Sequence, residues 1–172
     1  MKYSLRSFQY KVRVNKRIFR RFLNALERNT PRGLDKLVST AEQQVWPETD
    51  CLHCANCCKT MTPTYTPKDL NRISSHLGMT VDAFKTKWLR KEKNTGDWLN
   101  TSTPCQFLDL GTNKCSIYEV RPADCAGFPH LSKKRMVDYI HVHKQNLESC
   151  PASYKLVEKL MGLVIHNDHK AV

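Results

Sequence analysis

The residues of this 172-residue chain most suited to chemistry are its eight cysteines. Four form a C-x2-C-x2-C-C cluster and four follow singly: Cys51, Cys54, Cys57, Cys58, Cys105, Cys115, Cys125 and Cys150. A tight turn can aim thiolates that are separated by two residues at one metal ion. The first ten residues have no continuous apolar core and do not resemble an export signal, so we expect a reducing compartment. Such a compartment favours metal coordination over disulfides.

Eight thiols make two sets of four ligands, which suits two zinc ions, or one zinc ion and one iron–sulfur cluster. Thiolates bind zinc and iron alike, so the spacing does not choose between them. Cys57 and Cys58 are adjacent and point to opposite sides of an extended backbone, so they serve two sites or one is spare. A spare Cys58 beside Lys59 would be a reactive thiolate. Four histidines are secondary ligand candidates: His53, His130, His141 and His143.

Two short helices are expected between the cluster and the single cysteines. Thr66 followed by Pro67 predicts a capped helix that runs until Gly78. Thr80 predicts the cap of a second helix that reaches Leu89.

The single cysteines fall in a predicted hairpin and a turn. The turn at 111–114 joins two short strands and would hold Cys105 and Cys115 near one another. The stretch from Arg121 to Cys125 predicts a turn into a short helical step that ends by Pro129. Arg121 would either lie near the thiolates or pair with Asp124.

The C-terminal part is expected to contain a strand and a helix. Residues 136–143 read as a strand with Tyr139, His141 and His143 on one face. From Pro151 onward the apolar spacing predicts a helix that closes the core, followed by a frayed tail that contains His166 and His169.

The positive charge is concentrated at the start of the chain. The net charge is +12, and residues 1–40 hold eleven Lys or Arg against two acids, a net +9. Ile18, Phe22, Leu23 and Leu26 recur at helical spacing with arginines between them, which predicts a basic amphipathic helix. A break at 29–33 precedes a second helix over 34–45. The charge suits a nucleic acid, an acidic protein or a membrane surface, or simply a solvated face.

The composition indicates a small soluble protein. The mass is 20.0 kDa and the mean hydropathy is −0.56, and no apolar run is long enough to span a bilayer. A large multidomain enzyme is excluded by length. No phosphate loop or serine–histidine–acid motif is present, so kinase and hydrolase classes have no support. We expect a cytoplasmic location.

These features predict an α+β fold, a small irregular cysteine-rich metal-binding domain with short helices and a hairpin, preceded by a basic helical extension. The expected boundaries are 1–48 for the extension, 49–165 for the metal-binding domain and 166–172 for the tail.

The segment from Cys51 to Pro151 resembles the CxxCxxCC, or YkgJ-like, cysteine-cluster family. The resemblance rests on the cluster, the helix with Asp69, the stretch PCQFLD and the stretch CSIYEVRPADCAGFP. It implies a zinc- or iron-chelating domain with these matching positions: the cysteines, Tyr118, Arg121, Pro122 and Pro129. One branch is associated with lysine N-methylation of flagellin, and the resemblance to that branch implies an iron–sulfur centre as one form of the metal site. Ala126 departs from the arginine that many members carry.

The leading prediction is a metal-binding protein that coordinates zinc or iron, or holds an iron–sulfur cluster, through all eight cysteines. One alternative is a metal-dependent redox or protein-modifying enzyme, of the lysine N-methylation kind. Another is a nucleic-acid-binding zinc module, whose partner would lie along residues 1–40. The sequence does not decide whether the chain is an enzyme.

Overall fold

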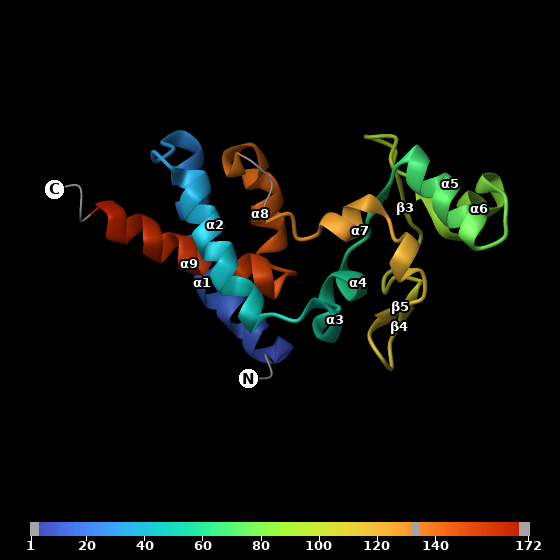
Figure 1. Ribbon diagram of the computed structural model, residues 1–172, viewed down its shortest axis with the longest axis horizontal. Coiled ribbons are helices and arrows are strands. Elements are labelled where there is room, and N and C mark those ends of the chain that lie inside the picture. The colour runs from blue at the N-terminus through green and yellow to red at the C-terminus, as the bar shows by residue number, and fades with distance from the viewer. Residues whose placement is uncertain (1–3, 132–134, 169–172) are drawn as a thin grey trace. The chain divides into compact units, whose positions relative to one another are not determined.

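The computed structural model describes residues 4–131 and 135–168 and divides the chain into two compact units (Figure 1). Unit 1 contains the residues up to Asp50 together with those from Pro129 onward, and unit 2 is Cys51–Phe128. The fold is mixed α+β with small antiparallel sheets, which confirms the predicted class. The predicted domain boundaries at 48 and 165 stay a prediction. His166 was expected in a frayed end but belongs to the helix Pro151–Asp168, and residues 169–172, with His169, lie outside the described residues.

Unit 1 is helical. Its elements are α1 (Leu5–Arg28), α2 (Leu34–Val45), η1 (Trp46–Glu48), η3 (Met136–Tyr139), α8 (Ile140–Asn146) and α9 (Pro151–Asp168). The predicted break between the first two helices is confirmed, and Gly33 enters α2 with a φ of 72° that favours glycine. The predicted C-terminal helix is α9, which packs against α1, α2 and α8. In the described parts of the chain, no helix has the length and apolar character needed to cross a membrane.

The core of unit 1 is built around Tyr154, whose side chain is 1% exposed. Its ring contacts Phe8 edge-on and Phe19 at a tilt, with centroids 5.9 and 5.0 Å apart. Asn15 Nδ2 donates to the Tyr154 hydroxyl over 2.7 Å, so the buried phenol is hydrogen-bonded. One aromatic residue of α9 therefore holds two turns of α1.

The buried face of α1 differs from the predicted one. The buried residues are Phe8, Val12, Phe19, Leu23 and Leu26. Ile18 is 52% exposed, so its assignment to the core was wrong. The helix carries two apolar rows, and only packing against α8 and α9 decides which row is covered.

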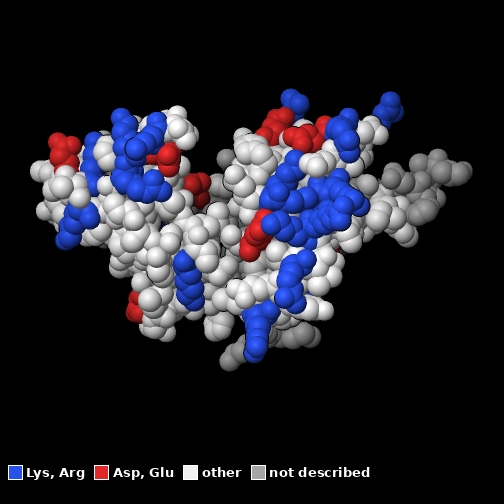
Figure 2. All heavy atoms as spheres, turned by 180° about the vertical axis from the view of Figure 1, so that it is seen from behind, with Lys and Arg blue, Asp and Glu red and all other residues white. Residues whose placement is uncertain are grey.

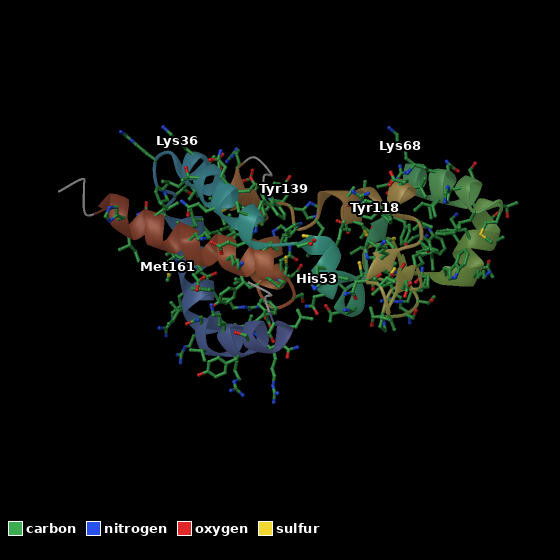
Figure 3. The ribbon with its side chains drawn as sticks, turned by 60° about the horizontal axis from the view of Figure 1, so that its bottom comes forward. Lys36, His53, Lys68, Tyr118, Tyr139 and Met161 are labelled. Carbon is green, nitrogen blue, oxygen red and sulfur yellow. The ribbon has the colours of Figure 1, made fainter. Side chains whose placement is uncertain are left out.

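The predicted strand at 136–143 was also wrong, because this segment is helical. A 3-10 turn, η3, leads directly into α8, and Figure 3 marks Tyr139 at their junction. Residues two apart lie on different faces of a helix, so His143 is buried while His141 is exposed. Met136, Ile140 and His143 all turn inward at helical spacing.

Unit 2 surrounds a small apolar core. Its elements are α3 (Cys51–Cys54), α4 (Asn56–Thr60), β1 (Thr64–Tyr65), α5 (Pro67–His76), α6 (Val81–Trp88), β2 (Leu89–Lys91), β3 (Trp98–Asn100), β4 (Leu108–Asp109), β5 (Lys114–Cys115), η2 (Tyr118–Val120) and α7 (Ala123–Gly127). Strands β1, β3 and β2 form an antiparallel sheet in that order, which the sequence reading missed. Phe84 and Ile73 are fully buried at the centre of the core.

The predicted helix caps, hairpin and helical step of unit 2 are confirmed. Thr66 caps α5 through a reciprocal pair of hydrogen bonds with Asp69, and Thr80 accepts from the Ala83 amide at the start of α6. The hairpin is β4 and β5, with Leu108 opposite Cys115. The predicted helical step is α7.

The buried His143 makes the stability of unit 1 depend on pH. Burial, and then the charges of His130 and His141, lower the pKa of His143 to about 4. In the unfolded chain the pKa returns to 6.5 and the imidazole binds a proton more readily. The contribution of His143 to the free energy of unfolding should therefore have its full value above pH 6.5. The free energy should fall by about 3 kcal/mol as the pH drops toward 4.

Urea unfolding across this pH range measures the effect. His143→Leu should flatten the profile, whereas His166→Gln, which removes an exposed histidine of α9, should leave it unchanged. Equal slopes for wild type and His143→Leu would contradict the assignment.

Candidate metal centre

All eight cysteines are free thiols, and within unit 2 the charges of several thiols act on one another. Burial raises the pKa of Cys105, Cys115 and Cys125, and each of these thiols also feels the charge of Cys58. The charges of Cys105 and Cys115 raise the pKa of Cys125 further. We call Cys58, Cys105, Cys115 and Cys125 the four-thiol group.

The backbone brings two members of the group into register. The Cys105 amide donates to the Cys58 carbonyl over 2.8 Å, which ties the end of the cluster to the start of the hairpin. Within the cluster, Ala55 has a φ of 45° and separates α3 from α4. This left-handed residue turns the chain sharply between Cys54 and Cys57, as the spacing predicts.

The hairpin and the apolar core place the next two thiols. Cys105 and Cys115 are partly buried and pack against the core residues of unit 2. The Ser116 amide donates to the Phe107 carbonyl over 2.8 Å and continues the β4–β5 pairing. The expectation that this hairpin brings Cys105 and Cys115 together agrees with the charge of Cys105 that raises the pKa of Cys115.

The fourth thiol depends on the buried carboxylate of Asp69. Its Oδ1 accepts from the Ala123 amide at the start of α7 over 3.1 Å, two residues before Cys125. The same side chain accepts from the Thr66 amide and hydroxyl and from Arg72 Nη2. Burial alone would raise the pKa of Asp69, but these hydrogen bonds hold it below its usual value. Asp69 therefore stays charged and anchors α7 to α5.

Cys58 differs from the other three members. The hydrogen bond with the Cys57 thiol, with sulfurs 3.9 Å apart, is the main cause that lowers the pKa of Cys58 to about 7. Lys59 lowers it further, while burial opposes both. The adjacent pair therefore does not point fully apart as an extended strand would, because both residues lie in α4.

A buried amide lies beside the group. Asn100 is 2% exposed, and its Oδ1 accepts from the Tyr65 hydroxyl over 2.7 Å and from Gln106 Nε2 over 3.1 Å. Its Nδ2 is buried and makes no hydrogen bond, yet the amide lowers the pKa of Cys105. Because the two donors occupy Oδ1, Nδ2 is the atom of this amide that can donate to the Cys105 sulfur. Burial and then Cys105, Cys125 and Cys115 raise the pKa of Tyr65, so its phenol stays neutral.

Positive charge reaches the group from Arg121. Its guanidinium lies 3.8 Å from the centroid of the Tyr118 ring, which Figure 3 labels, and donates to the Tyr118 carbonyl. Arg121 lowers the pKa of Cys115, which supports the expectation that it lies near the thiols. The Asp124 carboxylate accepts from the Thr64 amide over 3.1 Å and so ties α7 to β1.

Apart from Cys57, which lies in α4, the remaining predicted ligands lie in α3 and in unit 1. Cys51, Cys54 and His53 belong to α3, and the His53 carbonyl accepts from Asn113 of the hairpin. Cys150 belongs to unit 1, is 5% exposed, and accepts a hydrogen bond from the Ser153 amide at the start of α9. His130, His141 and His143 belong to unit 1 as well.

The thiols are near one another but do not form a closed site. Within residues 4–131 and 135–168, the structure contains no group of three or more His, Cys, Asp or Glu side chains already arranged to hold a metal ion. Asn100 and Tyr65 were not predicted from the sequence, and Asp69 was noted only within the family motif. Their roles depend on contacts across 35 to 54 residues, for which no spacing motif exists.

Replacing Asp69 should loosen α7. In Asp69→Asn, an NH2 group replaces one charged carboxylate oxygen, so it faces the donors of Thr66, Ala123 or Arg72 and cannot accept from them. Unit 2 should therefore lose about 3 kcal/mol of unfolding free energy. Urea unfolding measures this loss, and the rate at which a thiol reagent labels Cys125 should rise. Asp82→Asn, at a carboxylate with a 95% exposed side chain in α6, is the matched control. Unchanged stability and labelling in Asp69→Asn would refute the anchoring role.

Comparison with known proteins agrees with this cysteine framework. An uncharacterized protein of Methanocaldococcus jannaschii, MJ0661, is 36% identical over 86 residues, which are 49% of this chain and 46% of that protein. The matched part of the chain thus spans about half the length of this relative. No solved structure matches the chain. The model of the CxxCxxCC family, described as a "Putative zinc- or iron-chelating domain", matches residues 50–151. Because this match covers more than half of the chain, the protein belongs to the CxxCxxCC family.

Proposed function

We propose that the protein binds zinc or iron through cysteine thiolates, and that the four-thiol group is the first ligand set. The observation that carries the proposal is that one compact unit holds Cys58 hydrogen-bonded through its carbonyl to the Cys105 amide, with the charge of Cys58 acting on Cys105, Cys115 and Cys125. Four like groups that would repel one another as thiolates gain most from a shared cation.

The donor set suits these metals. All four residues are free thiols, and four thiolates are the usual ligands of a structural zinc ion and of iron–sulfur clusters. Cys105 and Cys115 pack against an apolar core, which limits the access of water to these two thiols. Closure of the site requires rotation of the cysteine side chains, since the described side chains form no closed set.

A closed set of four thiolates leaves no open position for a substrate. This favours a structural or electron-carrying role for the metal over direct catalysis. An iron–sulfur cluster would supply electron transfer, and a zinc ion would supply rigidity to a unit whose strands are only two or three residues long.

The other four cysteines stay proposed ligands. Cys51, Cys54 and Cys57 have the short spacing that suits a metal, and Cys150 is the eighth thiol. A second metal per chain would require them, so the number of metals bound decides their role.

The test is metal analysis of protein purified without oxygen. We expect about one zinc ion, or iron with matching acid-labile sulfide and visible absorbance, per four-thiol group. Cys105→Ser and Cys115→Ser should each lose that metal, while Ser116→Ala, an exposed neighbour in the same hairpin, should keep it. Full metal content in both cysteine variants would overturn the proposal, and a second metal that is lost only in Cys51→Ser or Cys150→Ser would assign the other set.

Asn100 should tune the metal through Cys105. Asn100→Asp keeps an oxygen for the Tyr65 hydroxyl and Gln106 but removes the buried N–H donor that is available to Cys105. We expect affinity for Zn²⁺, measured by competition with a chelator, to fall about 10- to 100-fold. Asn71→Asp places the same charge on an exposed face of α5 and should bind as wild type. Equal affinities for the two variants would contradict this role.

A further inference from the structure

The outer face of α1 carries two parallel rows that the metal-binding unit does not use. One row is apolar, and its side chains are 61%, 55% and 52% exposed at Tyr10, Val14 and Ile18. The other row is cationic and contains Arg13, Arg17 and Arg21. Each row has a spacing of four residues, and the rows are offset by three, so they lie side by side along the helix. We call this surface the two-row face.

The cationic row belongs to a wider groove along α1. The groove is lined by Arg13, Lys16, Arg17, Arg20, Arg21 and Asn24. Figure 2 shows a broad area of Lys and Arg side chains on the face that it draws. Lys16 and Arg20 pair with Glu148 of unit 1, at 2.7 and 3.0 Å. Among the described residues, no carboxylate forms an ion pair with Arg17 or Arg21.

The two rows call for a partner that presents anions and apolar groups together. A nucleic acid would satisfy the arginines through its phosphates but would leave Val14 and Ile18 exposed. An anionic bilayer offers headgroup phosphates to the arginines and acyl chains to the apolar row. Tyr10 has the amphipathic ring that is typical of the membrane interface, and Arg13 lies over it with 5.6 Å to the centroid.

We propose that the two-row face of α1 is a docking surface for an anionic phospholipid membrane, on which α1 lies parallel to the bilayer plane. The core-facing row of α1 stays packed on Tyr154, so docking requires no unfolding of unit 1. The inference concerns unit 1 and is independent of the metal site.

The experiment is co-sedimentation of the full-length protein with vesicles. We expect binding to vesicles that contain phosphatidylglycerol and none to vesicles of phosphatidylcholine alone. Arg17→Gln with Arg21→Gln should weaken binding about thirtyfold, because each charge near the surface contributes about 1 kcal/mol. Val14→Ser with Ile18→Ser should weaken it at least about tenfold, and this loss should persist in high salt.

Two control variants match these changes on other faces of unit 1. Arg32→Gln with Lys36→Gln removes the same charge, and Ile165→Ser replaces an apolar side chain that is 50% exposed on α9. Both should bind as wild type, and circular dichroism checks that every variant is folded. Absence of binding to the phosphatidylglycerol vesicles would overturn the proposal. Unchanged vesicle binding in the Val14/Ile18 variant would also overturn it. Tight, salt-sensitive binding of that variant to an RNA oligonucleotide would assign the arginines to nucleic acid instead.

Discussion

The hydrogen bonds of the buried Asp69 carboxylate are the interaction on which the fold of unit 2 depends. One buried charge accepts hydrogen bonds from the start of α5, from Arg72 and from the first residue of α7. Arg72 in turn donates to the Arg121 carbonyl, so the turn before α7 is held from both sides. A buried carboxylate without these donors would be strongly unfavourable, so the helices and the turn form together or not at all. Cys125 is thereby fixed relative to the core.

The unit that carries the four-thiol group has little apolar material of its own. Seven buried residues form its core, and its strands are two or three residues long. Small folds of this kind often rely on a metal for rigidity. Cys105 and Cys115 pack directly against that core. A metal bound by these thiols would therefore join the cluster, the hairpin and α7 at one point.

Unit 1 combines a well-packed interior with an unusual exterior. Tyr154 fixes one face of α1, while the opposite side exposes the two-row face. Exposed apolar side chains beside unpaired arginines do not stabilise a monomer, because the apolar groups stay in water and the charges repel one another. A function at this surface explains their presence better than the stability of the fold does.

The sequence by itself determined the features that depend on neighbours in the chain. The caps at Thr66 and Thr80, the hairpin turn at 111–114 and the break before α2 all follow from contacts within about four residues. Tertiary structure alone decided which row of α1 is buried, that 136–143 is helical, and which thiols influence one another electrostatically. These outcomes depend on packing and hydrogen bonds between residues far apart in sequence, such as Asp69 with Ala123, for which local spacing carries no signal.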